Sequence, residues 1–251
     1  MNPVALNIRG LTKVHKTECP IRPTVNWQGS HAYKLAKHLN KLIHLHIPLP
    51  NAFNIKSSVH LIEDLLGIPY KQGIRLVSFD IENMYPNIPT NELVPIIDGK
   101  SFRNQLDGKT TNELIKITRT VLEQNYFTFR NQSYSQITGL AIGAPSSAIL
   151  SEVYLQHLEH IKIVKIIMQH NIIGYFRYVY DILIVYDENS TDIYEVHKAF
   201  NSLASTIKFT LETEMDNNIN FLDISIQNKG NKLLFNIYRK PTATEVVIPK
   251  D

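Results

Sequence analysis

Hydrophobic positions along the chain follow two different spacings. In AYKLAKHLNKLIHL, leucine and isoleucine recur three and four positions apart with lysine on the other face, which predicts an amphipathic helix over residues 32–45. A second helix is expected in FNIKSSVHLIEDLLGIP, with Asn54 or Ser57 as its cap. The apolar run IRLVSFDI instead predicts a buried strand over residues 74–81 that ends near Asp80.

The remaining pattern mixes helices with hairpins. The prolines of residues 1–30 predict a basic loop or short hairpin there, and Arg130-Asn131-Gln132 divides the two aromatic-rich strands of YFTFRNQSYSQ. Further helices are expected over residues 90–97, 112–125, 146–169 and 191–206, and further strands over residues 175–179, 182–186, 207–213, 219–227 and 232–239. This order predicts an α+β fold with a mainly antiparallel sheet backed by helices.

Composition narrows the class of protein. The chain has 251 residues, of which 43% are hydrophobic, enough for one large domain or two small ones. The single cysteine, Cys19, cannot form an intrachain disulfide, which fits an intracellular protein. No apolar run approaches the ~20 residues of a membrane-spanning helix, so we expect no membrane partner. The ten histidines lack a spacing typical of metal ligands.

Basic residues are concentrated near the N-terminus. The net charge of the whole chain is only +3, but the segment from Arg9 to Lys71 contains nine lysines and arginines against three acids. This asymmetry indicates an anionic partner for the N-terminal third of the chain. The alternative is a basic surface that only interacts with solvent.

Two aspartates are candidates for metal-dependent chemistry. Asp80 ends the predicted buried strand, and Asp181 lies at the tip of the hairpin predicted in FRYVYDILIVYDE. If these strands are neighbours in one sheet, the two carboxylates converge and can hold two Mg²⁺ ions about 3.5 to 4 Å apart, as in nucleotidyl transfer. Spacing alone is a weak signal, because aspartates at strand ends commonly serve as turn or cap residues.

Five motifs in one order add a family resemblance. VSFDIENMYPNIP, GLAIGAPSSAILSEVYLQHLE, RYVYDILIVY, INFLDISI and FNIYRKPTAT resemble the palm of a reverse transcriptase, most closely that of the Penelope-like retroelements. The resemblance runs from LTKVHK to YRKPT, and it implies a right-hand polymerase fold. It places a fingers-like region over residues 1–73 and the palm over residues 74–251, with a fingers-side insertion at about residues 98–140. We expect a truncated thumb and no nuclease domain.

The resemblance also implies an activity and its partners. The expected reaction is RNA-directed DNA synthesis with Mg²⁺, or Mn²⁺ in its place, on an RNA template with a DNA primer and dNTPs. Asp80 would bridge both metals, the Ile81 carbonyl would add a ligand, and Asp181 would supply the second carboxylate. Hard oxygen ligands of this kind suit Mg²⁺. A monomer located in the nucleus is the expected state of such a protein.

Other residues are expected to contact the substrates. By resemblance, Tyr85 lies beneath the sugar of the incoming nucleotide, and Gly143 and Pro145 belong to a glycine loop that approaches the nascent base pair and template. Lys16 and Arg22 would meet the triphosphate, with solvated surface cations as the alternative. The primer and template would also contact Tyr178, Tyr238, Arg239 and Lys240. For Asp223, in FLDISI, a structural role is the better interpretation.

The hairpin departs from the family pattern at one position. Reverse transcriptases carry Tyr-x-Asp-Asp there, and Tyr180 replaces the first acid. A phenol with a pKa near 10 stays neutral at pH 7 and cannot balance a divalent cation. A one-residue slip that brought in Asp181 would turn its side chain to the opposite face. We therefore expect impaired catalysis. The alternatives are a catalytically inactive nucleic-acid-binding remnant, a structural domain without a nucleic-acid role and, last, a metal nuclease.

Overall fold

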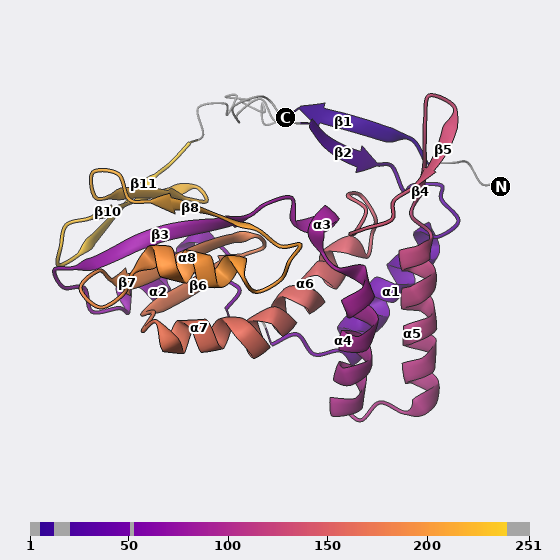
Figure 1. Ribbon diagram of the computed structural model, residues 1–251, viewed down its shortest axis with the longest axis horizontal. Helices are drawn as coiled ribbons and strands as arrows, with labels where there is room; N and C mark the ends of the chain where they lie inside the picture. Colours follow the sequence, from indigo (N-terminus) through magenta and orange to yellow (C-terminus); the bar gives the residue numbers. More distant parts are fainter. Residues whose placement is uncertain (1–5, 13–20, 51–52, 240–251) are drawn as a thin grey trace, which may run out of the picture.

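The computed structural model describes residues 6–12, 21–50 and 53–239, and it shows an elongated molecule with two parts (Figure 1). One part is built around a four-stranded sheet, and the other is a group of helices with two small hairpins. The sheet contains, in spatial order, β6 (Gly174–Tyr178), β7 (Asp181–Asp187), β3 (Ile74–Ile81) and β8 (Phe209–Thr213). All neighbouring strands in it are antiparallel.

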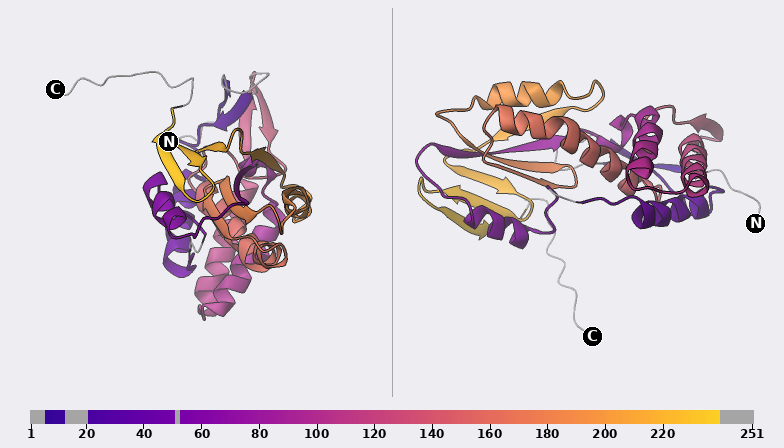
Figure 2. Two further views of the ribbon diagram at one scale, coloured as in Figure 1. Left: turned by 90° about the vertical axis from the view of Figure 1, so that its left-hand side faces the viewer. Right: turned by 90° about the horizontal axis from the view of Figure 1, so that it is seen from below.

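One face of this sheet is covered by helices (Figure 2). The covering elements are α6 (Ser147–Leu158), the π-helical turn η1 (Glu159–Ile163), α7 (Val164–Gln169) and α8 (Ile193–Asn201). Alternate strand residues point toward them, because successive side chains of a strand face opposite sides of the sheet. Phe79 of β3 meets Phe200 of α8 edge to face, with ring centroids 5.2 Å apart.

The opposite face is covered along only part of its length. There α2 (Ser58–Leu66) and a three-stranded sheet of β9 (Asn218–Phe221), β10 (Ile224–Asn228) and β11 (Leu233–Ile237) form a third layer. A second hydrophobic core fills this interface, with Leu61 and Leu65 of α2 packed near Leu76 of β3. The Ser57 hydroxyl caps α2 by accepting a hydrogen bond from the backbone N–H of His60.

The other part of the molecule lies beyond the end of β3 at which Asp80 is found (Figure 1). Its elements are α1 (Tyr33–His46), α3 (Met84–Asn87), α4 (Thr90–Arg103), α5 (Gly108–Glu123) and the hairpins β1 (Ile8–Thr12) with β2 (Ile21–Val25) and β4 (Tyr126–Phe129) with β5 (Gln132–Ser135). Its buried residues, such as Leu39, Ile97 and Leu114, are continuous with the core beneath the helix-covered face of the sheet.

The structure confirms the predicted α+β fold with an antiparallel sheet backed by helices. Several predicted elements have different bounds, and the helix expected over residues 112–125 spans Gly108–Glu123. The strand expected over residues 219–227 is two strands, because Leu222, with φ of 55°, reverses the chain between them. The helix expected over residues 90–97 continues to Arg103, and the helix expected over residues 191–206 ends at Asn201. In the part of the chain that the structure describes, no helix is long and apolar enough to span a membrane.

Candidate active site

The two aspartates singled out from the sequence lie opposite each other. Strands β3 and β7 are neighbours, and their register pairs Asp80 with Asp181. The backbone N–H of Ile81 donates to the Tyr180 carbonyl at 3.1 Å, which makes Asp80 and Asp181 a pair without hydrogen bonds between their own backbones. The Cα atoms of such a pair are about 4.5 Å apart and their side chains share one face. The condition for convergence, that the two strands be neighbours, is met.

A row of side chains crosses the sheet at this level. Tyr178 of β6 pairs with Asp181, and Asp80 pairs on its other side with Thr210 of β8. The row faces away from the helices, since Phe79 and Ile182, the flanking residues of β3 and β7, point into the helix-side core. Both aspartates are half-buried, and Tyr178 is exposed. The row therefore presents two adjacent carboxylates on the open part of this face.

The donor set at this row suits a hard cation. Two carboxylates and the neighbouring Ile81 carbonyl are oxygen ligands, and Mg²⁺ in proteins is bound through one or two carboxylates together with substrate phosphates. Among the residues described, no group of three or more histidine, cysteine, aspartate or glutamate side chains could enclose a metal ion. The residues present thus fit a cation for which the protein supplies some of the ligands and a substrate supplies the others.

The tip of the hairpin differs slightly from the prediction. Asp181 is the first residue of β7, and the two-residue turn consists of Val179 and Tyr180. Val179 has φ of 56°, a conformation that glycine adopts readily and a β-branched residue rarely does. The Tyr180 side chain is half-buried against the helix-side core. The aromatic ring that replaces the expected acid is therefore packed against the protein.

A buried ionic network holds the turn from the helix side. Arg177 of β6 is 1% exposed, and all five of its N–H groups are used. Its Nε donates to Glu159 at 2.6 Å, and its two terminal nitrogens donate to Glu152 at 3.0 and 2.8 Å. The remaining two N–H groups reach the second Glu159 oxygen at 3.2 Å and the Val179 carbonyl at 3.0 Å. Arg177 thereby ties the strained turn to α6 and η1.

The charges in this network support one another. Burial by itself disfavours the guanidinium charge, but the hydrogen bonds and negative charges of Glu152 and Glu159 raise the pKa of Arg177 above its ordinary value. Burial also opposes ionisation of Glu152, and Arg177 nevertheless holds the pKa of that carboxyl below its usual range. These three residues were not among those predicted from the sequence. The available signal was one arginine in an apolar strand and two acids seven positions apart in an apolar helix.

Tyr85 lies near α6 and the turn at Tyr180. It belongs to α3 and is half-buried. Burial raises the pKa of its phenol, and the nearby Tyr180 and Glu152 raise it further, while a hydrogen bond with Ser151 opposes the shift. Tyr85 is thus a neighbour of Tyr180. Its expected contact with the sugar of an incoming nucleotide stays a prediction.

The glycine loop is hydrogen-bonded to two other elements that carry predicted substrate-binding residues, α3 and β2. Its Leu140 N–H donates to the Tyr85 carbonyl at 2.7 Å, and its Ile142 carbonyl accepts from the Val25 N–H at 2.9 Å. Gly143 has φ of 110°, and a Cβ atom there would collide with the Val25 carbonyl. The protein itself therefore requires glycine at this position, a reason that differs from the expected approach to a base pair. Pro145, two residues on, is half-buried.

The remaining predicted contacts are spread over the molecule. Arg22 is exposed on β2, opposite Leu11. Tyr238 and Arg239 follow β11, and the Tyr238 N–H donates to the Asp223 carbonyl at 2.8 Å. The Asp223 carboxylate accepts a hydrogen bond from Ser58 of α2, in keeping with the structural role expected for it. Lys16 and Lys240 lie outside the described residues.

Comparison with solved structures finds this fold in polymerases. Apo telomerase from Candida tropicalis, truncated from its C-terminal domain, matches with a TM-score of 0.64 and 12% identity over 92% of this chain and 55% of its own. Telomerase from Candida albicans in complex with a TWJ fragment of telomeric RNA has a TM-score of 0.65 and 11% identity over 91% and 46%. The fold is that of a reverse-transcriptase-like polymerase.

Viral polymerases share this fold. The RNA-dependent RNA polymerase of a human picobirnavirus matches with a TM-score of 0.57 and 9% identity over 90% of this chain and 44% of its own. The chain spans about half the length of the telomerase chains that it matches. No family model and no curated protein matches the sequence. At these identities the likeness defines a fingers-palm polymerase fold, to which the row of aspartates belongs.

Proposed function

We propose that this chain is the fingers-palm portion of an RNA-directed DNA polymerase of a Penelope-like retroelement, with catalysis impaired by Tyr180. The observation that carries the proposal is the pairing of Asp80 with Asp181 across neighbouring strands of a reverse-transcriptase-like fold. Two carboxylates on one face of a sheet provide the ligands that a two-metal nucleotidyl transferase needs. The family motifs around them favour reverse transcription over other metal-dependent reactions.

The ligands in this proposal are Asp80, Asp181 and the Ile81 carbonyl. Mg²⁺ bound there, or Mn²⁺ in its place, would neutralise charge on the transferring phosphoryl group and on the primer hydroxyl. Tyr85, Gly143, Arg22 and Lys16 are assigned to the incoming dNTP. Pro145, Tyr178, Tyr238, Arg239 and Lys240 are assigned to an RNA template and a DNA primer. The telomerase structure that contains telomeric RNA supports nucleic acid as the partner class.

Tyr180 explains why activity should be low. A neutral phenol gives the metals one negative charge fewer, and loss of such a ligand commonly reduces the rate by about 100-fold or more. The slip expected from the sequence is not needed to bring Asp181 to the site, because Asp181 already pairs with Asp80 in the observed register. The impairment that we propose is therefore the loss of the first acid of the motif, at position 180, and not a misplaced Asp181. The change therefore weakens the chemistry and leaves the fold intact.

A primer-extension assay tests the proposal. We expect Tyr180→Asp to raise Mg²⁺- or Mn²⁺-dependent DNA synthesis on an RNA template by about 100-fold over the unchanged chain. Tyr180→Asn is the matched control, because asparagine has nearly the size of aspartate but no negative charge. This variant should give no increase in synthesis. Asp80→Asn in the Tyr180→Asp background should abolish the gain. Robust synthesis by the unchanged chain would refute impairment.

The assay also separates the second candidate function, an inactive nucleic-acid-binding remnant. The intact fold around a neutral Tyr180 favours that candidate as the present state of the chain. It predicts salt-dependent primer-template binding that Asp80→Asn leaves unchanged, and no synthesis by Tyr180→Asp. If Tyr180→Asp folds and binds primer-template but incorporates no nucleotide, the polymerase assignment is wrong.

A further inference from the structure

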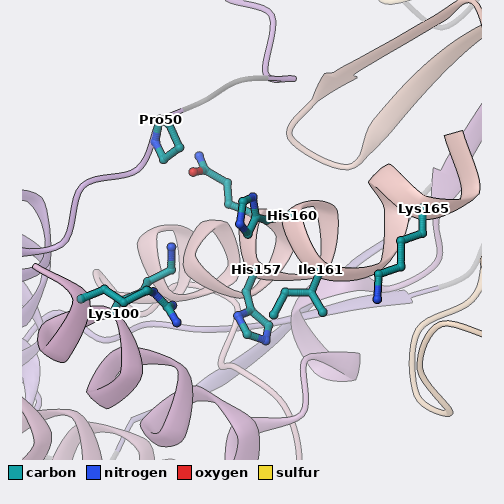
Figure 3. A pocket seen from close by; sticks show the side chains of 8 residues that line it. Pro50, Lys100, His157, His160, Ile161 and Lys165 are labelled. Carbon is teal, nitrogen blue, oxygen red and sulfur yellow. The ribbon is translucent and has the colours of Figure 1, made fainter. Parts of the chain in front are cut away.

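A basic cavity lies on the helix-covered side of the sheet, whereas the row of aspartates faces away from these helices. The cavity has a volume of about 460 Å³ and is formed between the C-terminal end of α4 and the continuous helix of α6, η1 and α7 (Figure 3). Five basic side chains line it: Lys100, Arg103, His157, His160 and Lys165. We call the space that they line the basic cavity.

No carboxylate lines the basic cavity. Within the described part of the chain, none of its five basic side chains forms an ion pair or a side-chain hydrogen bond. The acids of the adjoining helix, Glu152 and Glu159, point inward and are bound to Arg177. The positive charge of the basic cavity is therefore not balanced by the protein.

The lowered pKa values of two side chains that line the basic cavity are consistent with unbalanced positive charge. Burial lowers the pKa of His157, and Lys100, Arg103, Lys162 and His160 lower it further. Burial and then Arg103 likewise lower the pKa of Lys100. Lys162, the other cation of η1, donates to the Leu203 carbonyl at 2.6 Å. An anion in the cavity would relieve this repulsion and favour protonated His157.

The lining favours phosphate over an acidic protein segment. Protein partners are commonly anchored by buried apolar or aromatic side chains, and the cavity offers only Ile161 and Pro50 as apolar walls. Lysine and arginine alone are sufficient to bind a phosphodiester backbone without sequence preference. We propose that the basic cavity binds the phosphate groups of a nucleic-acid strand, as a second contact on the side of the molecule away from Asp80 and Asp181.

This proposal is tested by the salt dependence of RNA binding. Fluorescence anisotropy of a labelled 12-nucleotide oligouridylate, in EDTA, measures the affinity of the full chain between 50 and 300 mM salt. Removal of two phosphate contacts by Lys100→Ser with Lys165→Ser should reduce the slope of log K against log salt by about 1.4, at roughly 0.7 per contact for a single strand. The control is Lys198→Ser with Lys229→Ser, two exposed lysines outside the cavity, which should keep the slope. Equal slopes in the two double variants would overturn the proposal.

The pH dependence gives a second measurement. Because a bound phosphate would raise the pKa of His157, binding takes up a proton, and affinity should be up to roughly tenfold higher at pH 5.5 than at pH 8 for a one-unit shift. His157→Gln should bind as the unchanged chain does at pH 8 and lose much of the gain at pH 5.5. Circular dichroism melting confirms that each variant is folded. An unchanged pH gain in folded His157→Gln would contradict the assignment.

Competitors identify the source of the phosphate. Unlabelled oligouridylate should displace the labelled strand from the unchanged chain at far lower phosphate concentration than uridine monophosphate or inorganic phosphate does. Equal competition by the small molecules would overturn a backbone site, and tighter binding of a polyglutamate peptide would identify an acidic protein instead. The binding measurements are made in EDTA, where no metal-dependent synthesis takes place, so their outcome does not depend on whether Tyr180→Asp incorporates nucleotides.

Discussion

The two faces of the β6–β7 hairpin carry different arrangements of charged side chains. On the helix side, Arg177 is buried between Glu152 and Glu159 with every N–H group used. On the other side, Asp181 lies opposite a second acid, Asp80, across the strand pair. A buried ionic network holds its side chains in place because removal of one partner leaves an uncompensated charge, whereas like charges placed together are typical of a site that receives a cation from outside. The hairpin thus carries a paired ionic network on one face and one of two adjacent carboxylates on the other.

The largest expected effect comes from breaking the buried side. Arg177→Met leaves Glu159, whose side chain is 4% exposed, without its partner, and it frees the Val179 carbonyl. We expect the free energy of unfolding to fall by about 3 to 5 kcal/mol, the usual result of breaking a buried ion pair from one side. Urea denaturation followed by circular dichroism measures this change.

The matched control is Lys198→Met. Lys198 pairs with Glu195 on the surface of α8 at 3.6 Å, and its side chain is 78% exposed. Exposed pairs contribute at most about 1 kcal/mol, so the control should unfold almost as the unchanged chain does. Equal losses in the two variants would mean that the Arg177 network does not hold the hairpin.

A smaller effect of opposite sign is expected at the turn between the two faces. Val179→Gly removes a β-branched side chain from a residue with φ of 56°, and it should increase the free energy of unfolding by about 1 kcal/mol. Val59→Gly, at an exposed position inside α2, is the control and should lower it by roughly 0.5 to 1 kcal/mol. Guanidinium titrations measure both. Destabilisation by Val179→Gly would show that the turn is unstrained.

The smallest effect is expected at the other end of β7. Asp187 accepts from the Lys71 ammonium at 2.8 Å and from Asn189, and these contacts lower its pKa to about 2, with Lys71 the main cause. A carboxyl with a depressed pKa stabilises the fold above its ordinary pKa, and this stability is lost as the pH falls from about 4 to 2. Melting temperatures in this range should fall more for the unchanged chain than for Asp187→Asn.

Glu195→Gln serves as the control for this pH dependence. Glu195 is an exposed surface acid with a longer contact to Lys198. Its substitution should leave the acid-induced loss of stability nearly as large as in the unchanged chain. Parallel pH curves for Asp187→Asn and the unchanged chain would contradict the role given to Asp187.

Periodicity and turn chemistry predicted most of the fold. The helix expected over residues 32–45 and the strand expected over residues 74–81 match α1 and β3 closely, because their apolar spacing is regular over several turns or pleats. The break between β9 and β10 was not predicted. Leu222 and Asp223 make that turn without glycine, proline or asparagine, so the apolar alternation continues through it.

The site could be predicted only in part. Asp80 ends a strand that is clear from its sequence, but its partnership with Asp181 depends on which strands are neighbours, and local pattern does not determine this. Arg177 was missed because its partners lie 18 and 25 positions away on another element, where an acid in a helix normally indicates a solvated face. These contacts depend on which distant segments of the chain come together, and local secondary-structure propensity does not determine this.

The π-helical turn η1 determines which insertions and deletions this helix can accept. Each residue of an α-helix advances the chain by about 100° around the axis. In η1, which lies between α6 and α7, the helical hydrogen bonds join residues five positions apart instead of four. Insertion of one further residue within Glu159–Ile163 would rotate α7 against α6 by about 100°. Glu159 could then no longer reach Arg177 while Ile163 and Ile166 stayed in the core. Substitutions at exposed Ile161, and deletion of one residue, which can restore an α-helical turn, should be tolerated better than such an insertion.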